Sequence, residues 1–386
     1  MVSIIEPVGG HGGNEFYDFG LCEAIAEQGL KVTLYTCDET NLDLCFEPKT
    51  RVIKAFKQIY GKSLAIQRGL RYALGIAISL VDSKRNKSQL AHFHIYHFAL
   101  REWLAVFCFW LTRTRVVITI HDIESFDRYG EKEGVVSGIL SKTMVLMATG
   151  VIVHNEFAKS KVLEKFSKFP LDRIDVVPSG DLDFIYKTSI SKEEARANLI
   201  LPQEKQVILF FGQIKKVKGI DILIESLKYF KDESVKLVIV GKVWKDDLES
   251  YKLQAQALHL EEMIEWRTAY VSNETVPSYF KAADVVVLPY KIIYNSSVLL
   301  RSMDYGVPVV ASDLPVFGEI IDSGVNAMLF TSENPKSLSE AILTVLHNKE
   351  FASSMALNAA GYIHSAHSRQ LIGERMVAAY KKYESI

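Results

Sequence analysis

Two adjacent serines stand where a helix is predicted to begin, within the segment PYKIIYNSSVLLRSMDYGVPVV that ends at Val310. The helix would start at Ser296 and Ser297, include Val298 in its first turn and stop at Gly306, before a buried strand. Backbone N–H groups at a helix start are unpaired and carry positive partial charge, so an anion binds there without a metal ion. The pattern predicts a phosphate-binding site, and a plain helix cap is the alternative.

A second pattern of the same kind precedes it in the chain. Residues 206–219, QVILFFGQIKKVKG, read as a buried strand ending at Gly212, then a loop that carries Lys215, Lys216 and Lys218. Open α/β sheets bind ligands beyond the carboxyl ends of their strands, so these lysines are placed to reach an anion. The alternative is a solvated turn, but two anion-site patterns in one half of the chain favour phosphate binding.

A glycine-rich loop follows the first predicted strand, with Gly9, Gly10, Gly12 and Gly13 before a helix. It is not a dinucleotide fingerprint, because Glu15 stands where the third glycine of that motif would be needed. Small residues let a ligand approach the backbone closely, and a plain strand-to-helix turn is the alternative.

The fold class predicted around these residues is α/β, with two doubly wound parallel units. The first unit is expected to have strands near residues 2–6, 31–36, 91–95, 116–120, 150–153 and 174–177. The second is expected to have strands near residues 206–211, 235–240, 263–266, 284–288, 308–311 and 327–330. The polar segment 185–205 has little to build a core and marks the boundary.

Composition fits this two-unit picture. The chain has 386 residues, a net charge of -1 and 48% hydrophobic residues, which suits two globular domains and shows no bias toward nucleic acid. Its four cysteines form no C-x-x-C pair, as expected of reduced thiols in the cytoplasm: Cys22, Cys37, Cys45 and Cys108. We expect no signal peptide and no membrane-spanning segment.

Several segments, in order, resemble the retaining family 4 (GT4-type) glycosyltransferases with the GT-B fold. They include VGGHGGNEFYDFGLCEAIAEQGLKVTLYT, VVITIHDIESF, VIVHNEFAKSKVL, ILFFGQIKKVKGIDILIESL, YVSNETVPSYFKAADVVVLPY and VLLRSMDYGVPVVASDLPVFGEII. The resemblance implies two Rossmann-like domains that face a cleft. Residues 1–185 would bind the acceptor, residues 186–368 would bind the nucleotide sugar, and a C-terminal helix in 369–386 would cross back to the first domain.

The resemblance also implies roles for particular residues. His121 and Lys218 would be catalytic, with His121 contacting the donor sugar and its phosphate. The donor diphosphate would be bound by Gly12, Gly13, Gly212, Lys215, Lys218, Ser296, Ser297 and Val298. Candidates for donor sugar or ribose contacts are Asn295, Arg301 and Glu319.

The chain departs from the family pattern at this site. Many relatives have two glutamates where Ile293 and Arg301 stand, and an arginine where Gln213 stands. The segment NSSV resembles a variant of the family with a serine-rich turn in place of the first glutamate.

We expect no metal and no cofactor. Asp181 and Asp183 form a D-x-D pair, which holds metal in another glycosyltransferase fold but follows a different context here. His92, His94 and His97 have no neighbouring carboxylate in the sequence, so we interpret them as structural.

The resemblance therefore predicts a metal-independent, retaining hexosyltransferase-type enzyme. It would move a sugar from a nucleotide diphosphate sugar to a glycan or lipid-linked acceptor, in cell-surface polysaccharide synthesis. The alternatives are a catalytically silent nucleotide-binding or scaffold protein, favoured by the two absent glutamates, and a sugar-nucleotide epimerase, which would need cleft carboxylates for proton abstraction.

The segment 51–90 predicts a membrane contact. It carries nine basic residues against the single acid Asp82, interleaved with apolar side chains. It reads as basic, partly amphipathic helices that lie on an anionic membrane, and a solvated face is the alternative. We therefore expect peripheral binding to the cytoplasmic face of the membrane.

Overall fold

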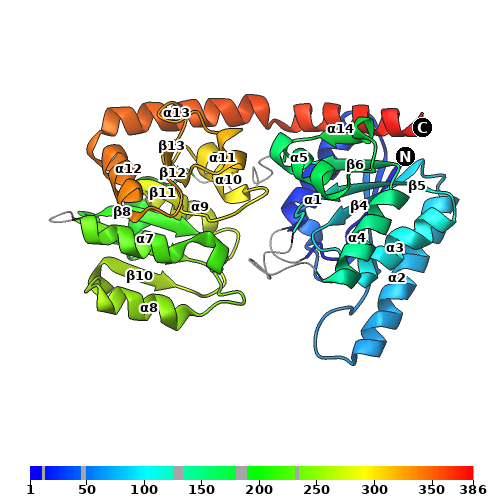
Figure 1. The fold of residues 1–386 in the computed structure, drawn as a ribbon, viewed down its shortest axis with the longest axis horizontal. Helices are drawn as coiled ribbons and strands as arrows, with labels where there is room; N and C mark the ends of the chain where they lie inside the picture. The colour runs from blue at the N-terminus through cyan, green and yellow to red at the C-terminus, as the bar shows by residue number, and fades with distance from the viewer. Residues whose placement is uncertain (11–13, 45–48, 125–133, 180–188, 231–233, 386) are drawn as a thin grey trace. The chain divides into compact units, whose positions relative to one another are not determined.

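The computed structural model describes residues 1–10, 14–44, 49–124, 134–179, 189–230 and 234–385 (Figure 1). The chain divides into two compact units. Unit 1 comprises Met1–Leu182 and His367–Ile386, and unit 2 comprises Asp183–Ala366. Four residues with predicted roles lie outside the described residues: Gly12, Gly13, Asp181 and Asp183.

Unit 1 is built on a seven-stranded parallel sheet in the order β3-β2-β1-β4-β5-β6-β7 (Figure 1). Its strands are β1 (Val2–Ile5), β2 (Val32–Cys37), β3 (Thr50–Phe56), β4 (Leu90–Ile95), β5 (Arg115–Ile120), β6 (Gly150–Val153) and β7 (Ile174–Val176). Its helices are α1 (Asn14–Glu27), α2 (Ala65–Arg85), α3 (Leu100–Leu111), α4 (Val135–Met147), α5 (Glu156–Lys165) and α14 (Arg369–Glu384). Helices cover the sheet, so β1, β2, β4 and β6 are buried along their whole length.

Unit 2 is built on a six-stranded parallel sheet in the order β10-β9-β8-β11-β12-β13. Its strands are β8 (Gln206–Phe211), β9 (Val235–Val240), β10 (Ile264–Arg267), β11 (Val285–Leu288), β12 (Val309–Ser312) and β13 (Met328–Phe330). Its helices are α6 (Lys192–Asn198), α7 (Ile220–Ser226), α8 (Leu248–Ala257), α9 (Val276–Ala282), α10 (Ser297–Asp304), α11 (Pro315–Gly318), α12 (Pro335–His347) and α13 (Lys349–Ala366).

The predicted α/β class with two doubly wound parallel units is confirmed, and the predicted strands lie within one or two residues of the observed ones. One strand was missed. Residues Thr50–Phe56 form the edge strand β3, whereas the sequence analysis read residue 51 onward as basic helices. Only the later part of that segment, α2, is a helix.

The C-terminal helix α14 packs on α1 within unit 1. A Cβ built on Gly373 would lie 2.3 Å from the carbonyl oxygen of Ala24, so only glycine allows this close approach. Arg369 pairs with Glu23 at 2.9 Å, which also ties the two helices together.

Candidate functional site

The end of β8 in unit 2 lies against two other elements of that unit. Gly212 follows β8 with φ 125°, and a Cβ built on Gly241 would lie 1.8 Å from the Gly212 carbonyl oxygen. A Cβ built on Gly212 itself would lie 3.6 Å from Cγ2 of Val298, in the first turn of α10. The structure therefore brings two predicted diphosphate-binding residues, Gly212 and Val298, into contact distance.

The lysine loop is fixed to the end of β11. Residues Lys216–Lys218 form a 3-10 turn that ends at Gly219, whose φ is 68°, and a Cβ there would lie 1.8 Å from the Pro289 carbonyl oxygen. Lys291 donates its backbone N–H to the Val217 carbonyl at 2.8 Å. The Nζ of Lys218 lies 3.7 Å from the centroid of the buried Tyr290 ring. Lys218 is thus held beside the segment that leads into α10.

Helix α10 begins as the serine pattern predicted. Ser296 is its N-cap residue, and its side chain accepts a hydrogen bond from the Leu299 N–H at 3.2 Å. Ser297 is exposed and Val298 partly exposed, so the first turn of the helix is accessible from solvent. Lys215 and Asn295 are also partly exposed. Ser296 does cap the helix, and the first turn of the same helix is accessible to an anion from solvent.

The two residues that stand where many relatives have glutamates, Ile293 and Arg301, differ in burial. Ile293 is buried, so it offers no polar contact at the surface, whereas Arg301 is partly buried on α10. Gln213 is exposed. Glu319 is exposed at the end of α11, and its charge helps to raise the pKa of Tyr362 after the larger effect of burial.

His121 lies just beyond β5 in unit 1. Its ring stacks on Tyr96, with centroids 4.2 Å apart, and its Nδ1 lies 3.1 Å from Nε2 of His154. Burial holds the pKa of His121 well below its ordinary value and lowers that of His154 to about 4. His121 is therefore neutral at pH 7.

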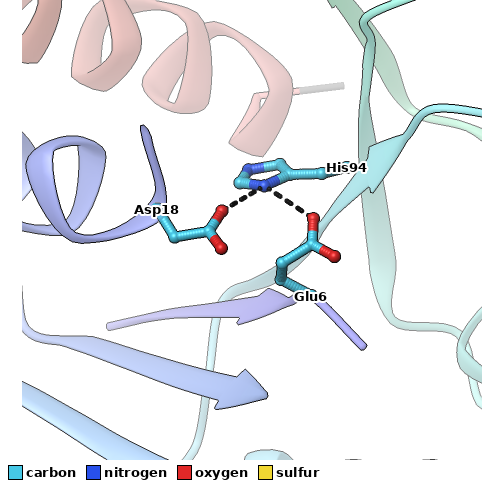
Figure 2. A group of neighbouring side chains, drawn as sticks. All are labelled: Glu6, Asp18 and His94. Carbon is cyan, nitrogen blue, oxygen red and sulfur yellow. Dashed lines mark hydrogen bonds and ion pairs between the residues drawn. The ribbon is translucent and has the colours of Figure 1, made fainter. Parts of the chain in front are cut away.

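A second buried group lies beside His121. Figure 2 shows Nδ1 of His94 directed at both Asp18 and Glu6, at 3.0 Å and 3.2 Å, and all three side chains are fully buried. Glu6 follows β1, His94 lies on the neighbouring strand β4, and Asp18 comes from α1. The ring of His94 lies 5.6 Å from that of His121.

The charges in this cluster depend on one another. Burial lowers the pKa of His94, but the hydrogen bonds and charges of Asp18 and Glu6 outweigh it and raise that pKa to about 9. Burial and the charge of Glu6 raise the pKa of Asp18 to about 7. His94 is thus an imidazolium at pH 7, held between the carboxyl groups of Asp18 and Glu6. One nitrogen or oxygen atom from each of the three side chains lies within 4.8 Å of the other two, which is close enough for the three to hold a metal ion.

His92, His94 and His97 were interpreted from the sequence as structural. Both ring nitrogens of His92 are hydrogen-bonded at 2.7 Å, to Tyr380 and Thr119. The carboxylates beside His94 were missed, because Glu6 and Asp18 are distant from it in sequence. The sequence did contain one indication: Glu6 is an acidic residue directly after a buried strand. The carboxyl end of that strand lies beside the carboxyl end of β4.

Two parallel α/β units are the architecture of the GT-B glycosyltransferases. Residues 11–183 match the model of Glycosyltransferase Family 4, and residues 191–361 match the model of Glycosyl transferases group 1. These matches cover most of the chain, which belongs to this family of glycosyltransferases.

Sequence identity to individual relatives is low. The chain is 29% identical to the uncharacterized glycosyltransferase MJ1607 of Methanocaldococcus jannaschii, over 60% of this chain and 59% of that protein. It is 23% identical to a D-inositol 3-phosphate glycosyltransferase of Xylanimonas cellulosilytica, over 88% and 84% of the two chains. The solved structure of Anabaena Alr3699/HepE in complex with UDP-glucose has a TM-score of 0.77 at 18% identity, covering 98% of this chain and 99% of that chain. This structural likeness shows a shared fold.

Among the described residues, no helix is both long enough and apolar enough to cross a membrane.

Proposed function

We propose that the protein transfers a sugar from a nucleotide diphosphate sugar to a hydroxyl of a lipid-linked glycan, with retention and without a metal ion. The observation that carries this proposal is the meeting of Gly212, Lys218 and the start of α10 at one sheet edge of unit 2. A UDP-glucose complex of the structurally similar Anabaena protein supports the choice of donor.

In the proposed reaction the bond between the anomeric carbon and the leaving phosphate oxygen breaks. The acceptor oxygen bonds to the same face of that carbon, and its proton passes to the departing diphosphate. Lys218, Lys215 and the first N–H groups of α10 stabilise the charge that develops on the leaving group. We assign the neutral His121 to the donor sugar and its phosphate.

A catalytically silent nucleotide-binding protein is the second candidate. It is favoured by the buried Ile293 and by Arg301, which stand where many relatives have glutamates. Asn295, Arg301 and Glu319 remain our candidates for sugar or ribose contacts.

One experiment separates these candidates. The protein is incubated with a panel of nucleotide sugars, with and without a lipid-linked glycan, and nucleotide release and product linkage are measured. Acceptor-dependent release, with an anomeric centre of unchanged configuration by NMR, is the expected result. Nucleotide binding without release would favour the silent candidate, and an inverted linkage would exclude the proposed mechanism.

We expect chelation to leave activity intact, because lysines and a helix start supply the positive charge that the diphosphate needs. The measurement is the transfer rate after dialysis against EDTA, compared with the same enzyme in added Mn²⁺ or Mg²⁺. A rate abolished by EDTA and restored by Mn²⁺ would contradict the proposed diphosphate site.

The membrane part of the proposal rests on an apolar face formed by three helices of unit 1. Helices α2, α3 and α4 pack side by side (Figure 1). On α2 the exposed apolar side chains recur every three or four residues: Ile66, Leu70, Leu74, Ile78 and Val81. The two neighbouring helices add Leu100, Leu104, Trp110, Leu111, Val135, Val136, Ile139 and Leu146. An apolar face of this extent marks an interaction site, and the basic residues on α2 favour an anionic bilayer.

Replacing two leucines of this face, Leu70→Ser with Leu74→Ser, should lower binding to anionic liposomes at least tenfold. Each leucine contributes about 1.5–3 kcal/mol when it leaves water completely. The measurement is cosedimentation with anionic and neutral liposomes at low and high salt. Leu253→Ser with Leu357→Ser, two leucines of unit 2 that are as exposed, is the matched control. If the wild type cosediments with neither liposome type, a soluble acceptor is favoured.

A further inference from the structure

A cavity of about 570 Å³ lies between α2 and α3 in unit 1. Its volume is within the range of about 300–1,000 Å³ that is usual for small-molecule sites. Its wall is mainly apolar and includes Gly69, Tyr72 and Ile76 of α2, Leu104 and Cys108 of α3, and Ile59 ahead of α2. A lining of this kind suits a hydrocarbon chain.

The cavity also carries positive charge. Arg68 and Arg101 both line it. Arg68 donates to the Gly61 carbonyl at 2.7 Å, and because a carbonyl is uncharged this contact leaves the guanidinium charge uncompensated. Arg101 pairs with Glu102, and Arg71, one turn along α2, donates to the carbonyl of Gln58. Two guanidinium groups line the cavity against the one carboxylate of Glu102, and the remaining positive charge favours an anionic head group.

One wall of the cavity contacts the segment that follows β1, at the carboxyl ends of the strands in unit 1. Tyr60, which lines the cavity, donates its hydroxyl to the carbonyl oxygen of Pro7 at 3.3 Å. Pro7 directly follows Glu6, which contacts His94, and the ring of His94 lies 5.6 Å from that of His121. A ligand with its tail in the cavity therefore has its head group near this edge.

We propose that this cavity binds the hydrocarbon chain of a phosphate-bearing lipid that carries the acceptor hydroxyl, with the phosphate at Arg68 and Arg101. The inference rests on the proposed function, whose acceptor it assigns to a chemical class. A lipid suits the site better than a soluble apolar ligand because Leu70 and Leu74, neighbours of the cavity residues Gly69 and Ala73, belong to the exposed apolar face. A lipid chain enters across this face without crossing water.

The direct test is calorimetric titration with octyl, decyl and dodecyl phosphate, each below its critical micelle concentration. Every two added methylenes should tighten binding by about 15-fold, and inorganic phosphate alone should not bind measurably. Arg68→Gln should weaken dodecyl phosphate about tenfold or more and leave dodecanol unaffected. Affinity that does not depend on chain length would overturn the proposal.

A pair of glycine variants tests the location. A Cβ built on Gly69 or on Gly361 of α13 meets no atom within 4 Å, and leucine is the better helix former, so both variants should fold. Gly69→Leu places its side chain in the cavity and should weaken dodecyl phosphate at least tenfold, whereas Gly361→Leu should bind as the wild type does. Wild-type affinity in Gly69→Leu would overturn the proposal. If the wild type is a dimer that Gly69→Leu disrupts, the cavity binds a second copy of the chain, and the lipid proposal is overturned as well.

Turnover separates this inference from the proposed function. Nucleotide release is measured with lipid-linked and water-soluble forms of one glycan. Gly69→Leu should lower the wild type's kcat/KM preference for the lipid-linked form at least tenfold, and an unchanged preference would count against the cavity. A wild type that releases no nucleotide with any donor would reject the proposed function alone, and the dodecyl phosphate titration would still decide the cavity.

Discussion

Lys218→Ala should lower kcat/KM for sugar transfer by about 10- to 150-fold. A hydrogen bond to a charged group contributes about 1.5–3 kcal/mol, and Lys218 is proposed to make one to the leaving diphosphate. The loss should be mainly in kcat, because charge on the leaving group grows in the transition state. The measurement is steady-state nucleotide release with saturating acceptor.

The fold of the Lys218→Ala variant should survive. The side chain is only partly buried, and its contact with the Tyr290 ring contributes about 0.5–1 kcal/mol. Lys216→Ala, in the same 3-10 turn but exposed, is the matched control and should change kcat/KM less than twofold. Unchanged turnover in a folded Lys218→Ala variant would remove this lysine from the mechanism.

The structure of the proposed diphosphate site shows which of its features a sequence can predict. Ser296 was predictable as a helix start because capping is local, and Gly212 because a buried strand precedes it. The close approach of Gly219 to Pro289 was not predictable, since it depends on how two strands and their loops meet in space. That approach is what places Lys218 on Tyr290.

Two features of unit 1 were missed for different physical reasons. Strand β3 lies at the sheet edge, so it is only partly buried and carries Arg51 and Lys54, which made it resemble an amphipathic helix. The cluster of Glu6, Asp18 and His94 joins three distant parts of the chain. Its members become neighbours only when β1, β4 and α1 pack together.

His94→Gln should destabilise unit 1 by about 3–5 kcal/mol at pH 7, because it leaves Glu6 and Asp18 buried without a cation. Hydrogen exchange of the β1 and β4 amides measures this loss, and the amides of unit 2 are the internal reference. The triple variant Glu6→Gln with Asp18→Asn and His94→Gln should lose less than His94→Gln alone, since it removes the carboxylate charges as well. If the triple variant is the less stable of the two, the buried-charge explanation is wrong.

Buried histidines and the Asp18 carboxyl group set the dependence of unit 1 stability on pH. Burial lowers the folded pKa values of four histidines, that of His154 to about 4, so the folded unit binds fewer protons than the unfolded chain: His92, His121, His154 and His367. Stability therefore rises between pH 4 and 6.5. Asp18, with its folded pKa raised to about 7, opposes this rise in stability, but it is one group against four histidines. Above pH 7 the sign reverses, because His94 keeps its proton in the folded unit up to about pH 9 and loses it near 6.5 when unfolded.

Wild-type unit 1 should thus be most stable near pH 6.5–7 and lose stability as the pH rises to 9, as His94 gives up its proton and its attraction to Asp18 and Glu6. The triple variant Glu6→Gln with Asp18→Asn and His94→Gln has no proton to lose at any of the three positions, so its stability should stay nearly constant from pH 7 to 9. His347→Gln, an exposed histidine of unit 2, should keep the wild-type profile. A loss between pH 7 and 9 that is as steep in the triple variant as in the wild type would show that a group outside this cluster carries the alkaline dependence.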